Sequence, residues 1–229
     1  MGASKAALAW HGSTLLRRVT GILARSLGEP VIVVSAPGQA LPAVGGSVEV
    51  VADERTGRGP LQGLAAGLRA VRDWTDVAYV SSVDVPLLHP AFVHAVVASL
   101  EPGFDIAAPE VNGRRQPLAA AYRVDVLGMV EELLSQDRLA MSALLDRCRV
   151  RRLAGAELPA PESLTNLNDP ADYEHALALP APPVSVNGSV IRAWRLGDVL
   201  GSRRPATLNG EPVDPDPELP LVAGDAVTF

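Results

Sequence analysis

The stretch Gly59–Pro86, GPLQGLAAGLRAVRDWTDVAYVSSVDVP, decides the fold class of this sequence. Its first half has the apolar spacing of an amphipathic helix, with Leu61, Leu64, Leu68 and Val71 on one face. Its second half, Val77–Pro86, is a short apolar run that ends in an acid, as expected for a buried strand. A helix followed by such a strand is the building unit of an α/β protein.

The segments on either side repeat this alternation. Upstream, Ser13–Leu27 has helical spacing with Ser13 as the expected N-cap, and it is followed by two β-branched runs, Pro30–Ala36 and Val48–Asp53. Downstream we expect a helix over 89–100, strands over 105–111 and 118–123, and helices over 124–135 and 138–147. The order predicts a largely parallel sheet covered by helices on both faces, with functional loops at the carboxyl ends of the strands.

The character of the chain changes near its end. Residues 179–184, LPAPPV, contain three prolines and indicate a linker. Beyond it, apolar and polar residues alternate about Asn187-Gly188, which predicts a β-hairpin, and residues 196–200 fit a brief helix. We therefore expect a first domain over residues 1–179, a linker over 180–183 and a small β-rich unit over 184–229.

Composition limits the classes of function. The chain has 229 residues and a net charge of −6, so it has no general attraction for nucleic acid. No apolar run approaches the ~20 residues that cross a bilayer. The single cysteine, Cys148, suits a reducing compartment. These features predict a cytoplasmic protein that binds neither nucleic acid nor membranes, and whose anionic substrate is small.

Two acids stand at the ends of predicted strands. Asp84 follows the apolar run YVSSV, and Asp53 ends the run VEVVA. A carboxylate at such a strand end can hold Mg²⁺ against nucleotide phosphates, because this metal prefers oxygen ligands and keeps several waters. The same position also suits an acid that caps a following helix, and the residues alone favour neither interpretation.

The loop between Asp53 and Gly63 has the composition of an anion site. Arg55 and Arg58 lie among glycines directly before the helix that starts near Pro60. Backbone N–H groups at a helix start and nearby cations bind phosphate. The alternative is an ordinary turn with two solvated arginines.

Two further polar motifs have local explanations as well as functional ones. Arg114, Arg115 and Gln116 precede a predicted strand, where they could bind an anionic co-substrate or form an exposed hairpin tip, and the tip is the default. In the motif TNLNDP, Asp169 is a good helix cap and Pro170 suits the first helical position. Capping leaves the two preceding asparagines, Asn166 and Asn168, unexplained.

Taken in order, several segments together resemble a known family. They are MGASKAAL at 1–8, GPLQGLAAGL at 59–68, VDVP at 83–86, RRQPLAAAYR at 114–123 and NLNDPADY at 166–173. This ordered set, which covers about residues 1–179, resembles the molybdenum cofactor guanylyltransferases among the MobA-like nucleotidyltransferases. The resemblance implies a three-layer α/β/α Rossmann-like domain. It also implies transfer of GMP from GTP to molybdopterin-bound molybdenum, with release of pyrophosphate.

The resemblance also assigns roles to residues. Lys5 would contact the nucleotide phosphates, Asp53 the guanosine and Asp84 the Mg²⁺ ion, so that Lys5 and Asp84 are the expected catalytic residues. The nucleotide loop would comprise Arg58, Gly59, Pro60 and Leu61. The side that receives the pterin would comprise Arg115, Gln116, Pro117, Asn166 and Asn168.

The sequence departs from the family pattern at two places. Members of the family begin with a buried strand and a loop like LAGGxSxRMGxxK, whereas this sequence begins at the last part of that loop, Met1–Lys5. We therefore expect the first strand and the glycine loop to be missing from these 229 residues, and we hypothesise a true start upstream. Pro37 stands where the family often has an asparagine that contacts the nucleotide, which leaves the choice between GTP and CTP open.

The tail resembles a second family. The segments SVNGSVIRAW, LGDVLG, ATLNGEPV and VAGDAVTF are similar to β-grasp sulfur carrier proteins. Those carriers act through a terminal Gly-Gly, but this sequence ends in Val227-Thr228-Phe229, so a carrier role is not expected. The tail would then dock a protein partner of the cofactor pathway or pack on the transferase. The alternatives for the whole chain are a related transferase that uses CTP or another acceptor, and a non-catalytic interaction protein.

Overall fold

The computed structural model describes residues 4–28, 30–45, 48–53, 57–201 and 207–229. The helices are α1 (Leu15–Leu27), α2 (Pro60–Val71), α3 (Pro90–Ala98), α4 (Leu127–Ser135), α5 (Met141–Leu145), α6 (Pro170–Leu177) and α7 (Gly197–Leu200). The strands are β1 (Ala9–Trp10), β2 (Ser13–Thr14), β3 (Val31–Ser35), β4 (Val48–Ala52), β5 (Val77–Ser81), β6 (Ile106–Val111), β7 (Arg114–Arg115), β8 (Ala119–Arg123), β9 (Val150–Ala154), β10 (Pro183–Val186), β11 (Ser189–Arg192), β12 (Thr207–Leu208), β13 (Glu211–Pro212) and β14 (Ala226–Thr228).

The main sheet has the order β5-β8-β6-β7, with β9 paired to β6 as well. β6 and β9 are parallel, but β8 is antiparallel to both β5 and β6. The expectation of a largely parallel sheet is therefore wrong for β8. The reason is its connection: only a short hairpin separates β6 from β8, and a parallel return needs a crossover of a dozen residues or more.

β3 and β4 form a separate parallel pair. Residues of β3 and β5 line an apolar cleft of about 490 Å³, which is also bordered by α1 and α2. The Tyr79 hydroxyl on β5 has no hydrogen-bond partner among the described residues, and burial raises its pKa. Among the described residues, no strand joins the two sheets across this cleft.

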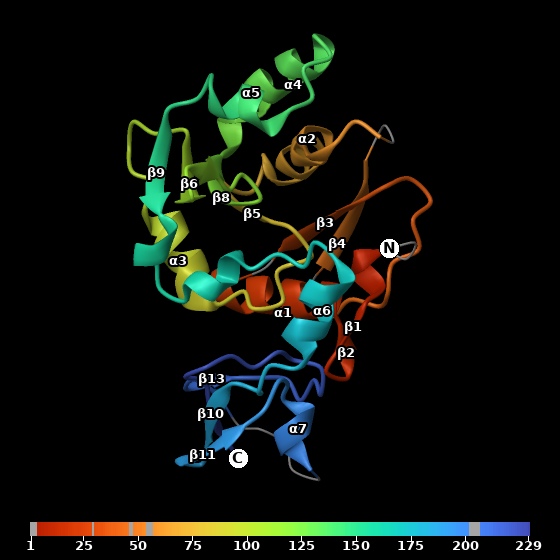
Figure 1. Ribbon diagram of the computed structural model, residues 1–229, viewed down its shortest axis with the longest axis vertical. Helices are drawn as coiled ribbons and strands as arrows, with labels where there is room; N and C mark the ends of the chain where they lie inside the picture. The colour runs from red at the N-terminus through yellow and green to blue at the C-terminus, as the bar shows by residue number, and fades with distance from the viewer. Residues whose placement is uncertain (1–3, 29, 46–47, 54–56, 202–206) are drawn as a thin grey trace.

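Helices cover both faces of the strands, which confirms the three-layer α/β/α architecture. In Figure 1, α2, α4 and α5 lie above the strands, and α1 and α3 lie below them. Leu61 and Leu133 from the upper layer share a buried cluster with Ile106 of β6. Ile22 and Phe92 from the lower layer form another cluster with residues of β6 and β8. The hydrophobic core therefore lies on both sides of the main sheet.

Many element boundaries follow the sequence closely, but the strand expected over 77–86 ends at Ser81, and the helix expected over 138–147 is the shorter α5. Two further differences concern the cap of α1 and the strand β9. α1 is capped by Thr14, whose side chain accepts from the Arg17 N–H, so the expected cap at Ser13 is wrong. Ser13 instead donates to Glu218 at 3.0 Å. The strand β9 was not expected, because its exposed positions carry Arg151 and Arg152, which hide the apolar pattern.

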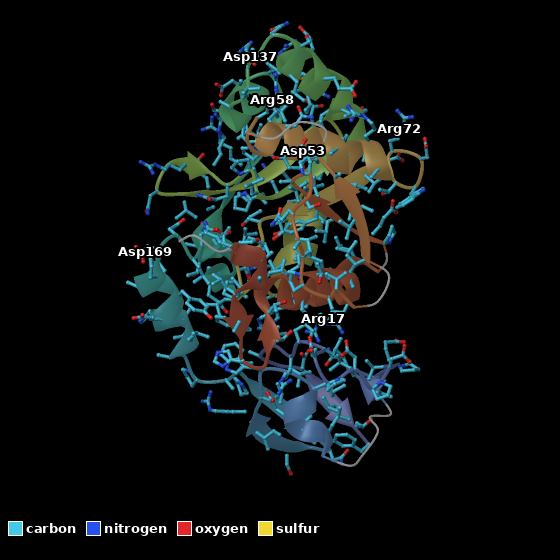
Figure 2. The ribbon with its side chains drawn as sticks, turned by 90° about the vertical axis from the view of Figure 1, so that its right-hand side faces the viewer. Arg17, Asp53, Arg58, Arg72, Asp137 and Asp169 are labelled. Carbon is cyan, nitrogen blue, oxygen red and sulfur yellow. The ribbon has the colours of Figure 1, made fainter. Side chains whose placement is uncertain are left out.

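Residues 183–229 contribute a further sheet, which we call the C-terminal sheet, with the order β11-β10-β14-β12-β13 and the short helix α7. The expected hairpin at Asn187-Gly188 is confirmed by the antiparallel pairing of β10 with β11. Arg17 of α1 forms an ion pair with Asp216 at 2.5 Å, and Arg25 pairs with Asp225 at 2.9 Å. Figure 2 shows Arg17 on the side of α1 that faces the C-terminal sheet.

Candidate active site

Asp84 lies just beyond the carboxyl end of β5, where the sequence places it. β5 ends at Ser81, and the Ser82 N–H still donates to the Leu118 carbonyl at 3.0 Å. The chain then turns, because the Leu88 N–H donates to the Val85 carbonyl at 3.1 Å. The Asp84 side chain is 16% exposed, so part of its carboxylate is accessible to solvent. The main chain before and after Asp84 is fixed by the two hydrogen bonds just described.

Lys5 and Leu167 close around this acid. The Lys5 ammonium lies 2.7 Å from Asp84 Oδ2 and donates to the Leu167 carbonyl at 2.7 Å. The Leu167 N–H in turn donates to the Asp84 main-chain carbonyl at 2.9 Å. Three segments far apart in sequence therefore meet at one point, and two of them, at Lys5 and Asp84, were expected in the same site.

The end of β3 approaches the same region through Gln39. Its side-chain amide donates to the Ser4 hydroxyl at 2.8 Å, and its carbonyl oxygen accepts from the Ala36 N–H at 3.2 Å. Ser4 directly precedes Lys5, so the loop after β3 is tied to the segment that carries the cation. Pro37, where the family often has an asparagine, lies in this loop.

Asp53 follows β4, at the same end of the β3-β4 pair. Its N–H donates to the Ser35 carbonyl at 2.7 Å, which extends the pairing of the two strands by one residue. Figure 2 shows Asp53 in the upper part of the molecule, below Arg58. Met1–Ala3 and Arg55, which were also part of the sequence argument, lie outside the described residues.

In the nucleotide loop expected at Arg58–Leu61, residues 59–61 form the start of α2, whereas the Arg58 side chain turns away to another helix. Gly59 has φ of 73°, the left-handed conformation expected at this helix entry, and Pro60 is the first residue of α2. Leu61 is fully buried in the core. The Arg58 guanidinium lies 3.0 Å from Asp137 and donates to the Leu134 carbonyl at 2.8 Å. Figure 2 shows both labelled residues near the top of the molecule. The structure therefore turns Arg58 toward the end of α4.

The residues expected on the pterin side fall into two groups. Arg115 pairs with Asp146 at 2.6 Å, Gln116 donates to the Arg114 carbonyl at 3.1 Å, and the Pro117 carbonyl accepts from the Tyr122 hydroxyl at 2.7 Å. This group forms the second strand of the β6-β7 hairpin and the residues after it, whereas the turn itself is Asn112-Gly113. The hairpin of the default interpretation is therefore present, with its tip two residues earlier.

The second group, Asn166 and Asn168, flanks Leu167 and therefore lies beside Asp84. The Asn168 N–H donates to the Asp172 carboxylate at 2.9 Å. Asp172 and Asp169 form a capping box at the start of α6, with Pro170 at the first helical positions, which confirms the expected cap. The cap fixes the backbone that holds Leu167 against Asp84 and Lys5.

The donor set at Asp84 fits a metal that takes few protein ligands. Among the described residues, no three His, Cys, Asp or Glu side chains cluster as a metal cage. A single carboxylate suits a hard divalent cation that fills its other positions with waters and substrate phosphates. The chemistry at this edge is therefore compatible with a divalent metal carried in by a phosphorylated substrate.

Two residues of this site were missed from the sequence, Leu167 and Gln39. Leu167 acts through its main-chain N–H and carbonyl, which any residue type could supply. Its one sequence indication is its place between two asparagines that capping does not explain. Gln39 acts from a loop whose approach to Ser4 depends on the tertiary fold.

The fold is that of an α/β protein, and its candidate ligand site lies at the carboxyl ends of strands. Residues 1–153 match the family model described as the MobA-like NTP transferase domain. The chain belongs to this family.

Similar proteins extend the match beyond that domain. A probable molybdenum cofactor guanylyltransferase of Mycobacterium avium is 35% identical over 176 residues, covering 75% of this chain and 86% of the relative. That of Mycobacterium marinum is 37% identical over 186 residues, covering 80% and 86%. The crystal structure of molybdopterin-guanine dinucleotide biosynthesis protein A from Archaeoglobus fulgidus aligns with a TM-score of 0.62 at 20% identity, covering 76% and 89%, and thus supports the fold.

Proposed function

We propose that this protein transfers GMP from GTP to molybdopterin-bound molybdenum, joining GMP to the phosphate of the molybdopterin, and releases pyrophosphate. The relatives that are 35 and 37% identical bear the name molybdenum cofactor guanylyltransferase, and the chain belongs to the MobA-like NTP transferase family. The observation that carries the proposal is the contact of Lys5 with Asp84 at 2.7 Å, at the end of β5. In this proposal Lys5 is the phosphate-binding cation and Asp84 the metal-binding acid, and their contact supports a shared site.

We assign the metal as Mg²⁺ and Asp84 as its protein ligand. When bound, the metal would neutralise charge on the phosphates of GTP. Lys5 would then exchange its contact with Asp84 for one with the phosphates, because both partners of the present ion pair gain a more highly charged partner. Leu167 holds both residues through its main chain, so the exchange would leave the backbone in place.

The chain supplies alignment and charge, and no covalent nucleophile is needed. A phosphate oxygen of molybdopterin attacks the α-phosphorus of GTP in line, and the bond to pyrophosphate breaks. Transfers of this kind depend on positioning and electrostatic stabilisation. In the proposed arrangement, Asp53 binds guanosine, and Gly59 and Leu61 offer backbone N–H groups at the start of α2, with Pro60 between them. The stretch Asn166–Asn168 faces the acceptor.

Arg58, Arg115, Gln116 and Pro117 are proposed in narrower roles. Because the Arg58 guanidinium is paired with Asp137, we propose that it fixes the loop before α2. Since Arg115 is paired with Asp146, the hairpin it belongs to would form a wall of the acceptor side.

We propose that residues 184–229 form a β-grasp-like unit, supported by the mixed order of the C-terminal sheet. Its ion pairs with α1 support packing on the transferase over docking of a separate protein. No helix of the described residues is long and apolar enough to cross a membrane. The one free cysteine, Cys148, supports a cytoplasmic location.

The proposal is tested by incubating the protein with molybdenum-loaded molybdopterin, Mg²⁺ and either GTP or CTP. The expected result is pyrophosphate release and a guanine dinucleotide product with GTP, separated by chromatography. A cytosine dinucleotide as the main product would contradict the assignment of the nucleotide. Absence of product with either nucleotide would contradict the transferase assignment.

A further inference from the structure

Arg18 of α1 is a buried cation whose hydrogen-bond partners are main-chain carbonyls. The residue is 4% exposed. No Asp or Glu of the described residues lies within ion-pair distance of its guanidinium, whereas its neighbours Arg17 and Arg25 both pair with acids of the C-terminal sheet. Burial lowers the pKa of Arg18 to about 9. Because burial of a charge costs free energy, a buried guanidinium needs hydrogen-bond acceptors around it.

Its acceptors are main-chain carbonyls from two parts of the molecule. Nε donates to the Pro86 carbonyl, in the turn that follows Asp84. Nη1 donates to the Trp194 carbonyl at 3.2 Å, and both terminal nitrogens contact the Leu221 carbonyl at 3.5 Å. The guanidinium also lies over the Trp194 ring, 5.0 Å from its centroid. Arg18 therefore joins the C-terminal sheet to the turn that carries the proposed metal ligand.

Two more contacts join the same parts. Val222 packs in one buried cluster with Val85 and Leu88, which lie in the Asp84 turn. The His89 ring nitrogen Nε2 lies 3.1 Å from the Ala223 carbonyl. Val222 and Ala223, in the loop before β14, thus contact the turn from Val85 to His89, the first by packing and the second by hydrogen bonding.

A buried cluster that contains two tryptophans lies on the other side of the Asp84 turn. Leu167, which binds both Asp84 and Lys5, shares a buried cluster with Trp10 and Trp194. The ring centroids of Trp10 and Trp194 lie 5.3 Å apart in an edge-to-face arrangement. Trp194 therefore contacts Arg18 on one side and the cluster of Leu167 on the other.

We propose that the C-terminal sheet positions the Asp84 carboxylate for metal binding, and that Arg18 is the positioning residue that transmits this effect. The inference rests on the proposed role of Asp84. Arg18 is suited to it because a planar guanidinium can serve several carbonyls in fixed directions, which a lysine ammonium on a flexible stem cannot do. Partners behind a metal ligand typically change metal affinity or activity by about 10–100-fold when lost.

The test uses two matched pairs of variants in the full chain. Arg18→Lys removes the bridge to Pro86, while Arg25→Lys alters another arginine at the same interface that does not contact the turn. Val222→Ala removes packing under Val85 and Leu88, while Val227→Ala makes the same change within the core of the C-terminal sheet. If Arg18→Lys does not fold, the comparison of Val222→Ala with Val227→Ala tests the proposal by itself.

The readouts are the Mg²⁺ concentration for half-maximal GMP transfer and the hydrogen exchange of the Leu88 and Leu167 amides. We expect Arg18→Lys and Val222→Ala to raise the Mg²⁺ requirement about tenfold or more and to speed both amides. The two controls should leave both readouts near wild type. Equal effects in test and control variants, or no effect in either, would overturn the proposal.

The exchange readout separates this inference from the proposed function. If wild type shows no GMP transfer, the proposed function fails, and Mn²⁺ binding followed by electron paramagnetic resonance replaces the activity readout. Weaker Mn²⁺ binding together with faster exchange in the two test variants would still support positioning. Unchanged Mn²⁺ binding would overturn it.

Discussion

The main sheet and the β3-β4 pair both end in an acid, but they differ in how firmly they are held. In the main sheet, β6 and β8 each have four consecutive buried residues. In the smaller pair, β4 has no buried residue, and Val50 is 48% exposed. β5 is linked through β8 to the rest of its sheet, whereas β3 has only β4 as a strand neighbour among the described residues.

The difference shows where the molecule can hold a charged group precisely. Asp84, which follows β5, is fixed by Leu167 on one side and by the Pro86 turn on the other. Asp53, which follows β4, belongs to the pair whose contacts with the rest of the fold are mainly those with α2, with a smaller number to α1. This difference in rigidity fits the two proposed roles. Asp84 is the carboxylate that has to stay in a fixed place to bind the metal, and Asp53 contacts the nucleoside.

The largest effect on stability is expected for truncations that compare the two sheets. Ile106→Ala in β6 removes a fully buried side chain and should lower the free energy of unfolding by about 2–5 kcal/mol. Val50→Ala in β4 should change it by less than about 0.5 kcal/mol, because the side chain is half exposed. Urea denaturation of both variants and wild type measures the difference. Similar losses would mean that the two sheets are equally important to the fold.

A smaller effect on stability is expected for the pair of Asp105 and Arg149 at the edge of the main sheet. The Asp105 carboxylate accepts from the Arg149 N–H at 2.7 Å and from its guanidinium at 2.7 Å. The guanidinium of Arg149 holds the pKa of Asp105 below its usual value. Because the folded pKa is the lower one, the ionised carboxylate contributes stability at neutral pH, and this contribution is lost as the pH falls through the folded pKa.

Asp105→Asn should therefore weaken the protein by up to about 1 kcal/mol near pH 7 and make its stability less sensitive to acid below about pH 4. Urea denaturation of wild type and variant across this pH range gives both quantities. Arg152→Gln, which alters a looser pair with Glu110 at 3.7 Å on the same edge, serves as the control. An acid-side slope that is the same in Asp105→Asn and wild type would contradict the assignment.

Much of the fold was predictable because local patterns decide it. The runs that form β3, β5, β6 and β8 are short and rich in apolar residues, and the Asp169 cap and the Asn187-Gly188 turn depend on their own side chains and backbone. β9 was missed because an exposed edge strand carries arginines where a buried one carries valines. The antiparallel direction of β8 depends on a hairpin whose strand pairing the sequence does not specify.

The candidate site was predictable in part. Lys5 and Asp84 were named from motifs that lie far apart in the chain, and they meet in the structure. The partners of Arg58 and Arg115, Asp137 and Asp146, are exposed acids whose proximity depends on the placement of α4 and α5. Leu167 acts through its own main-chain groups, and Arg18 binds main-chain carbonyls of distant segments. Contacts with the main chain do not depend on residue type, so the sequence does not predict them.

The most direct test of the account compares Mg²⁺-dependent GMP transfer by wild type, Asp84→Asn and Asp53→Asn, with each fold checked by circular dichroism. A metal ligand contributes several kcal/mol to the transition state, so Asp84→Asn should lower the rate by about 100-fold or more and abolish its Mg²⁺ dependence. Asp53→Asn should act mainly by raising the KM for GTP. A fully active, Mg²⁺-dependent Asp84→Asn protein would contradict the central claim that Asp84 is the metal-binding carboxylate.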